Sequence, residues 1–299
     1  MSIGKVITQN LYGEPEELSS AHRVYFKIFE LFTLYYVIQL SWEWGLYTLK
    51  ITDVVLPLGI ANIIDISFMH GNNLPLINAA LISVLMLFAF FRKGEKWIYM
   101  VALVLLHLQY VARFSIGEIP HSANLVGMAL FSFAVGCTFF EKELHRYRFI
   151  FGFTIFYIGL GYFSASISKL IGTGIFWVDG RHLWLWIAEK GTDILSREGS
   201  FSYSFVQELA LKSIPAATLM LLVGILTEFF GILIWFKKLR PYVTLALVGM
   251  HFGVMMSMNI RFDSFMIELL ILGFPYPELM NRYNFKISKD SAINKILQI

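Results

Sequence analysis

The stretch IPAATLMLLVGILTEFFGILIWF, residues 214–236, contains one charged side chain, Glu228, in an otherwise apolar run. As an α-helix it would be roughly 34 Å long, which is enough to cross the hydrocarbon core of a bilayer. Comparable runs lie at 24–49, 75–91, 97–114, 122–140, 148–170, 241–258 and 263–280. The sequence therefore predicts an all-α polytopic membrane protein, a bundle of about eight transmembrane helices. Pro275 and Pro277 interrupt the last run and predict that its helix is short or tilted.

The composition supports this class. Of 299 residues, 57% are hydrophobic and 15% are charged, against about 45–50% and about 25% in soluble domains. These values exclude a disordered, collagen-like or coiled-coil protein. The single cysteine, Cys137, cannot form an internal disulfide. The net charge of +3 is scattered, so no nucleic-acid partner is predicted.

Lysine and arginine predict the orientation. They concentrate in three short loops near 92–96, 142–148 and 237–240, whereas the loops at 115–121 and 259–263 hold only one, Arg261. Positively charged short loops stay in the cytoplasm, so these three loops and both termini are expected there. The predicted division is a cytoplasmic tail (1–23), one membrane domain (24–280) and a second cytoplasmic tail (281–299).

The long segment 172–213 is rich in aromatic residues, among them Phe176, Trp177, Trp184 and Trp186. Tryptophan favours the headgroup level of a bilayer. We therefore expect two short amphipathic helices in this segment, lying on the outer face.

Inserting a charged side chain at bilayer depth costs about 2.5–3.5 kcal/mol, so each such residue is expected to have a structural or functional role. Lys169 is the single lysine deep in an apolar run, His121 opens the run at 122–140, and His251 falls mid-membrane in 241–258. The predicted topology places all three toward the outside. We expect them to line an outward-facing pocket, with His107 as a further member.

Helical spacing adds neighbours to these residues. Tyr162 and Ser166 share a stripe with Lys169, and Asn124 lies one turn after His121. Further candidates for binding a substrate or quinol are Trp177, in the aromatic segment, and Glu268, in the outer half of the last run.

Structural explanations remain open for each of these groups. Lys169 would also fit as a snorkelling lysine, His121 as an interfacial cap and His251 as a hydrogen-bonded core histidine. Glu228, in the inner half of its run, favours a hydrogen bond to a neighbouring helix, and Glu30 favours the membrane interface. Methionines surround His251, but methionine packs ordinarily in apolar helices, so no metal site is predicted.

Three motifs, in order, resemble those of one protein family. They are HSANLVG (121–127), YFSASISKLIGTGIFWVDGRHL (162–183) and TEFFGILIWFKKLRPYVTLALVGMHFG (227–253). They are similar to segments of the vitamin K-dependent γ-carboxylases and their short bacterial relatives, the HTTM family. The resemblance covers about residues 115–280 and implies a bacterial inner-membrane location.

The resemblance implies a mechanism. In the carboxylases a neutral lysine deprotonates reduced vitamin K, oxygen adds, and the basic product removes a proton from a substrate glutamate that then captures carbon dioxide. Lys169 matches that lysine, His121 matches a histidine of the carboxylation step, and His251 matches a histidine of a later helix. Ser168 stands where the carboxylases usually have a first lysine. The implied cofactor is a reduced quinone of the vitamin K or menaquinol type.

Three functions follow from these patterns. The first is a quinol-dependent enzyme, a carboxylase-like lyase or a quinol oxidase, that modifies a peptide or a small substrate. The sequence ends at Ile299, soon after the last apolar run, without the large extramembrane domain of the carboxylases. This favours the second function, a non-catalytic membrane subunit or maturation factor for a small secreted peptide or a partner protein. A transporter is the third, although no repeat symmetry is visible.

Overall fold

The computed structural model describes residues 15–52, 56–91, 96–115, 124–285, 287 and 297. Throughout these residues the regular secondary structure is helical, without a strand, as the sequence predicts. Contacts divide the chain into two compact units. The first unit contains the described residues of 15–154 and those from 275 onward, and the second contains Ile155–Phe274.

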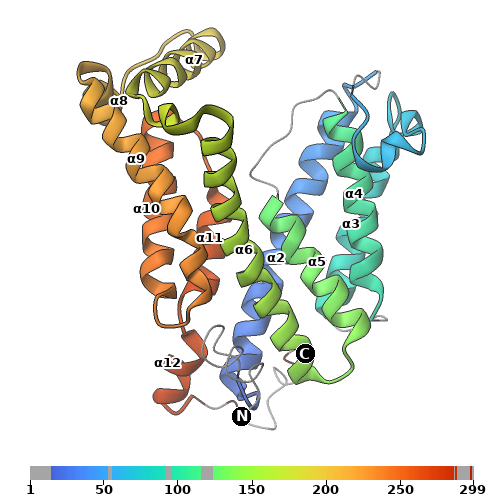
Figure 1. Cartoon of the computed structure of the whole chain (residues 1–299). Helices are drawn as coiled ribbons and strands as arrows, with labels where there is room; N and C mark the ends of the chain where they lie inside the picture. Colours follow the sequence, from blue (N-terminus) through green and yellow to red (C-terminus); the bar gives the residue numbers. More distant parts are fainter. Residues whose placement is uncertain are drawn as a thin grey trace. The chain divides into compact units, whose positions relative to one another are not determined.

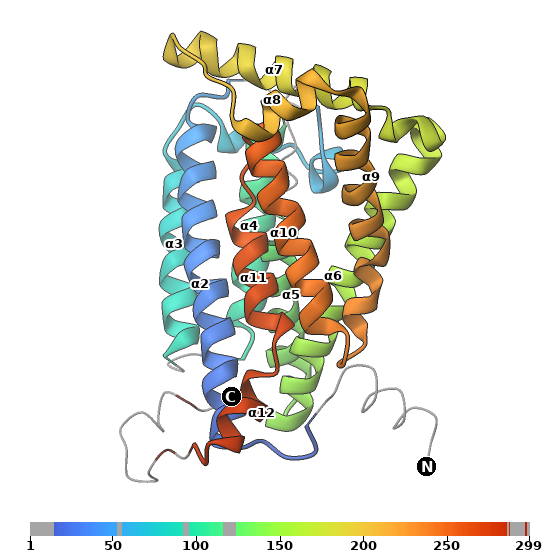
Figure 2. The same ribbon diagram turned by 90° about the vertical axis from the view of Figure 1, so that its left-hand side faces the viewer.

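The first unit is a bundle around helix α2 (Ser20–Thr48). It also contains α3 (Leu74–Phe90), α4 (Ile98–Phe114), α5 (Asn124–Phe139), the start of α6 (Glu143–Thr173), α12 (Tyr276–Arg282), η2 (Gly59–Asn62) and η3 (Ser67–Met69). Helix α2 packs against α3, α4, α5 and α12, and α4 packs against both α3 and α5 (Figures 1 and 2). Ser19 starts α2 by a reciprocal capping box with His22.

Aromatic side chains fill the core of this unit, where the rings of Phe26, Phe29 and Phe133 are fully buried. A charged pair lies among the same helices: Lys27 Nζ is 2.6 Å from Glu30 Oε2. The hydroxyl of Tyr99 also donates to Glu30, and Lys27 donates to the carbonyl of Phe90 at 2.9 Å. Glu30 therefore has its partners inside the bundle, and its predicted level at the membrane interface stays a prediction.

The second unit begins within α6 and continues through η5 (Gly174–Val178). It then contains α7 (Gly180–Glu198), α8 (Phe205–Lys212), α9 (Ile214–Phe230), η6 (Gly231–Trp235), α10 (Arg240–Met258) and α11 (Asp263–Gly273). Helix α10 packs against α7, α8, α9 and α11. Figure 1 shows α7 and α8 near one end of α9 and α10.

Local sequence explains where these helices start. The Asp179 side chain accepts from Arg181 N at the start of α7, Ser204 forms a capping box with Gln207 for α8, and Ser213 caps α9 just before Pro215. The prediction of two helices between 172 and 213 is confirmed. Their position on the outer face of a membrane stays a prediction.

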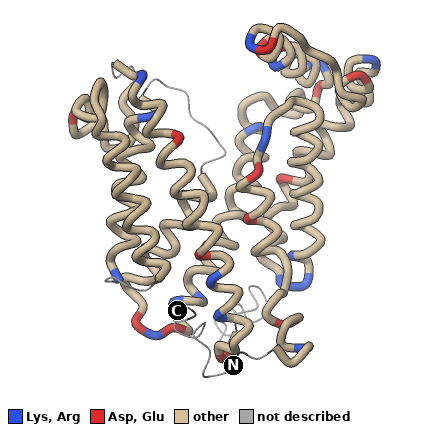
Figure 3. The backbone as a smooth tube through the Cα atoms, turned by 180° about the vertical axis from the view of Figure 1, so that it is seen from behind, with Lys and Arg blue, Asp and Glu red and all other residues tan. Residues whose placement is uncertain are grey.

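Three helical segments are long and apolar enough to cross a membrane: Glu143–Val178, Ile214–Trp235 and Arg240–Met258. Three shorter apolar helices are Leu74–Phe90, Ile98–Phe114 and Asn124–Phe139. Helix α11 has 11 residues and ends at Gly273, so the run at 263–280 does form a short helix, as its prolines predict. The structure supports a membrane protein, and the count of eight spans stays a prediction. Charged residues are sparse along these helices (Figure 3).

Candidate functional site

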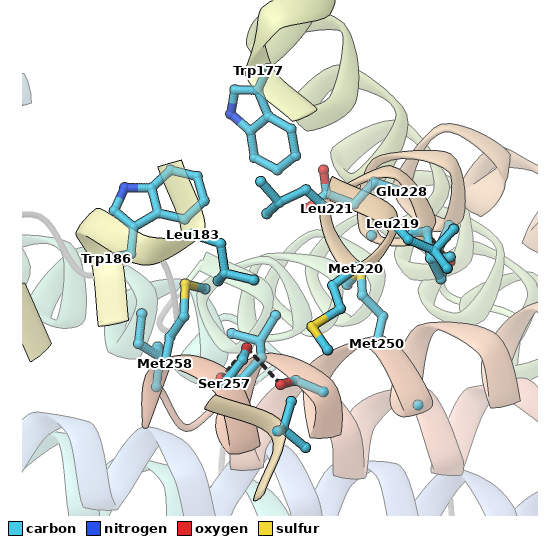
Figure 4. Close-up of a pocket in the computed structure, with 18 of the residues that line it drawn as sticks. Trp177, Leu183, Trp186, Leu219, Met220, Leu221, Glu228, Met250, Ser257 and Met258 are labelled. Atoms are coloured by element: carbon cyan, nitrogen blue, oxygen red, sulfur yellow. Dashed lines mark hydrogen bonds between the residues drawn. The ribbon is translucent and has the colours of Figure 1, made fainter. Parts of the chain in front are cut away.

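A cavity of about 810 Å³ lies in the second unit, lined by residues of α7, α9, α10 and the end of α6. Most of its wall is apolar and includes Leu183, Leu221, Met220, Met250 and Met258 (Figure 4). The hydroxyl of Ser257, which also lines it, is satisfied by the carbonyl of Gly253 at 2.8 Å. Small-molecule sites in proteins are about 300–1,000 Å³ and mainly apolar with a few polar groups, so both size and lining are typical of a ligand site.

Two lysine–glutamate pairs make up the charged part of the wall: the Lys190–Glu189 pair of α7, at 3.9 Å, and a closer pair between α6 and α9. Lys169 Nζ, on α6, donates to both carboxylate oxygens of Glu228, on α9, at 2.5 Å each. The lysine side chain is 31% exposed and the glutamate side chain 14% exposed. An amine held symmetrically by a carboxylate at this distance favours an ammonium ion. This geometry differs from the neutral amine that the resemblance implies.

Trp177 completes this corner of the cavity. Lys169 Nζ lies 5.0 Å from the centroid of its ring, a cation–π contact that leaves the indole facing the cavity. The sequence prediction that Trp177 belongs to the binding residues is consistent with this position. Its η5 segment directly follows α6, which is why Lys169 and Trp177 meet although they are eight residues apart.

The hydrogen bond predicted between Glu228 and a neighbouring helix is present. Its partner there is Lys169 of α6. The depth of Glu228 in the membrane stays a prediction.

Three glycines create the space of the cavity. Gly224 on α9 and Gly249 and Gly253 on α10 line it, and a Cβ added to any of them would meet no atom within 4 Å. Sequence reasoning missed these positions. The i, i+4 spacing of Gly249 and Gly253 is the signal that would have pointed to them, because such a pair leaves a groove along one helix face.

His251 lies outside the cavity lining. Its Nε2 shares a 2.5 Å hydrogen bond with the hydroxyl of Tyr162, and its ring packs against those of Phe262 and Phe265. Ser166, next along the stripe on α6, is buried and donates to the carbonyl of Phe163. The stripe predicted on α6 thus exists, but of its three members Lys169 alone lines the cavity.

Glu268, on α11, is fully buried in the second unit. Asn124 and His107 belong to the first unit, where Asn124 starts α5 and His107 is exposed on α4 with its ring parallel to that of Tyr110. His121 lies outside the described residues. Of the predicted site residues, the structure therefore brings Lys169 and Trp177 to one cavity, and His251, Tyr162 and Glu268 to a region beside it.

No group of three or more His, Cys, Asp or Glu side chains suited to a metal ion occurs among the described residues. No protein family, curated protein or solved structure matches the chain in comparisons with known proteins.

Proposed function

We propose that the protein is a membrane protein that binds a lipid-soluble molecule with a polar head, of the quinol type, in the cavity of the second unit. The observation that supports this most directly is a mainly apolar cavity with a close ion pair, Lys169–Glu228, on its wall. A hydrophobic body fits the methionine and leucine lining, and a head group that both donates and accepts hydrogen bonds fits the ion pair.

A quinol head satisfies both partners of the pair. Its hydroxyl oxygen accepts from the Lys169 ammonium, and its hydroxyl proton is donated to the Glu228 carboxylate. The resemblance of the three sequence motifs to carboxylase relatives leads to the same class of ligand. The cavity wall is formed by α9 and α10, two segments long and apolar enough to lie in a bilayer, so a membrane-dissolved ligand has a short route to the site.

The ion pair also sets the chemistry that we propose. Glu228 accepts the proton of the bound hydroxyl, and the Lys169 ammonium stabilises the oxyanion that this transfer creates. In the subsequent reaction a bound quinol would be oxidised to the quinone, and dioxygen would accept its two electrons and two protons. This revises the sequence hypothesis, in which Lys169 itself is the base, because the structure pairs the amine with a carboxylate.

Quinone binding to the purified full-length protein in nanodiscs tests the proposal. Binding is followed by quenching of tryptophan fluorescence with a soluble menaquinone analogue. We expect saturable quenching that is lost in Gly253→Leu, which adds a side chain to the cavity wall at a position where an added Cβ meets no atom within 4 Å. Gly161→Leu is the matched control, because it also points into open space but lies away from the cavity lining. Equal binding by both variants would reject the site.

Turnover is tested separately from binding. Wild-type protein should oxidise the reduced analogue in an oxygen-dependent reaction, and Lys169→Ala should not. Lys212→Ala is the control, because its exposed pair with Glu208 lies outside the cavity lining. Binding without any turnover in the wild type would retain a quinol-binding protein and reject the enzyme.

One observation favours a second function, a non-catalytic subunit. Large apolar side chains around η5 are strongly exposed, with Ile171 at 80%, Ile175 at 76% and Phe176 at 72%. Such a patch is typical of a surface that contacts a partner protein or lipid. A stoichiometric partner that co-purifies with wild type and with Lys169→Ala, together with biological function in that variant, would select this alternative.

A further inference from the structure

A second hollow of the second unit lies where α7 begins against the first turns of α9. It is an open groove of about 420 Å³, and its described lining residues differ from those of the cavity. The helices approach closely here at Gly180, where an added Cβ would lie 2.5 Å from the carbonyl oxygen of Ile214. The backbone N–H of Gly180 donates to the hydroxyl of Thr218 at 3.0 Å, so the start of α7 is held against α9.

Part of the groove lining is apolar and strongly exposed. Ile175 and Phe176 of η5 are 76% and 72% exposed, and Ile214 of α9 is 42% exposed. Ile171, four residues before Ile175, is 80% exposed near the end of α6. Several large apolar side chains with this exposure in one short region are typical of a surface that contacts lipid or another protein.

An ion pair supplies the polar part of the lining. Arg181 donates to the Asp179 carboxylate from Nε at 3.0 Å and from Nη2 at 2.5 Å. Its side chain is 70% exposed, and the hydrogen bonds described for it leave the N–H groups of Nη1 available. Guanidinium donors are arranged to bind the oxygens of a phosphate in pairs. Arg181 is therefore suited to a phosphate ligand even while it binds Asp179.

The groove lies where two apolar helical segments meet. Glu143–Val178 ends and Ile214–Trp235 begins at residues of its lining, and both segments are long and apolar enough to cross a membrane. Figure 2 shows the end of the first segment beside α9, and η5 packs against α9. Asp179 and Arg181 follow the first segment directly. A change from apolar to charged residues at the ends of two spans is expected where hydrocarbon meets lipid headgroups.

We propose that this groove binds a phospholipid of the surrounding bilayer. Its phosphate accepts hydrogen bonds from Arg181, and its acyl chain covers Ile175 and Phe176. A free phosphate would leave the apolar side chains uncovered, and a hydrocarbon chain alone would leave the guanidinium without its acceptor. A bound lipid accounts for the exposed apolar side chains without a partner protein. The inference does not rest on quinol binding, because the groove and the cavity have different linings.

Native mass spectrometry of the full-length protein, titrated in detergent with dioleoylphosphatidylethanolamine, tests the site. We expect Arg181→Gln to bind this lipid about 10-fold more weakly than wild type, because a charge-assisted hydrogen bond to the phosphate is lost. The variant should still fold, because Asp179 caps α7 through the backbone N–H of residue 181. Arg197→Gln is the matched control, since Arg197 is also exposed in an ion pair of α7 but lies outside the groove lining.

Two results of this titration would overturn the proposal. One is equal affinity of Arg181→Gln and Arg197→Gln for the lipid. The other is equal binding of dioleoylglycerol by wild type, because that molecule has the same acyl chains and no phosphate.

Fluorescence quenching in nanodiscs provides a second readout, for the apolar part of the groove. A fluorophore attached to Ile175→Cys labels the groove selectively, because the single cysteine of the chain, Cys137, is buried. We expect strong quenching by lipids that carry a spin label on the acyl chain, and weak quenching at Ser196→Cys, a control in the charged part of α7. Quenching at Ile175→Cys no stronger than at Ser196→Cys would mean that this surface faces water or a partner protein, and would overturn the proposal.

Discussion

Each unit contains a lysine–glutamate pair with a close contact between its packed helices, and the surroundings of these two pairs differ. Lys27–Glu30 in the first unit is closed: its side chains are 7% and 1% exposed, and Tyr99 and the Phe90 carbonyl supply further hydrogen bonds. Lys169–Glu228 in the second unit is open: its side chains are 31% and 14% exposed, and both line a cavity. A pair of the same two residue types is buried between helices in the first unit and lines a cavity in the second.

The largest expected effect is on the closed pair. Lys27→Ala should destabilise the protein by about 3–5 kcal/mol, because it leaves the Glu30 charge buried beside Tyr99 without its cation. Unfolding in a denaturing detergent measures the change. The double variant Lys27→Met, Glu30→Leu should recover most of the loss, since apolar replacement of a buried pair is often neutral. A cost below about 1 kcal/mol for the single variant would contradict a structural role for this pair.

The open pair should respond in the opposite way. Glu228→Gln should cost only about 1 kcal/mol of stability, because the pair is partly exposed to solvent. It should reduce quinol oxidation by about 100-fold or more, because the proton acceptor is lost. Parallel measurement of unfolding and turnover separates the two effects. If the variant unfolds as readily as Lys27→Ala and keeps its turnover, the contrast between the pairs is wrong.

A smaller effect is expected at Trp177, which contacts Lys169 from the cavity side. Trp177→Leu removes a cation–π contact worth about 0.5–1 kcal/mol and should weaken binding of the menaquinone analogue by about 2–5-fold. Trp97→Leu is the control, because that exposed tryptophan belongs to the first unit. Displacement of a radiolabelled analogue measures both affinities, and equal affinities would remove Trp177 from the site.

The smallest effect concerns pH at the start of α7, next to the cavity. The hydrogen bonds that Asp179 accepts from the side chain and backbone of Arg181 lower its pKa from 3.8 to about 2. A lowered folded-state pKa means that this stabilisation is present above about pH 4 and is lost as pH falls toward 2. Hydrogen exchange at the first turn of α7 should accelerate over that window in wild type. In Asp179→Asn the exchange rate should follow only the intrinsic pH dependence of amide exchange. A pH profile in this variant identical to that of wild type would contradict the role of the Asp179–Arg181 hydrogen bonds.

Much of the fold could be predicted from the sequence, because long apolar runs admit few alternatives to a helix in a membrane. Residues 214–236 correspond closely to the segment Ile214–Trp235, and the helices in 172–213 follow from amphipathic spacing and caps. The burial of Glu30 could not be predicted, because its hydrogen-bond partner Tyr99 lies 69 residues away in sequence.

The candidate site was only partly predictable for the same reason. Spacing along one helix correctly grouped Tyr162, Ser166 and Lys169, but it cannot show which partner each residue meets on another helix. Pairing of Lys169 with Glu228 depends on how α6 and α9 are aligned, and the cavity depends on Gly249 and Gly253, whose effect is the absence of a side chain. Sequence therefore grouped these residues and missed their division between a cavity, lined by Lys169, and a separate buried hydrogen bond between Tyr162 and His251.

Photo-crosslinking with an azido-menaquinone analogue, followed by mass spectrometry, tests most directly whether the open pair faces a quinol site. The account predicts that labels fall on the cavity walls, between Gly224 and Glu228 of α9 and between Met250 and Ser257 of α10, and that unlabelled analogue competes them away. Labels confined to the first unit, or labels that excess analogue does not displace, would contradict it.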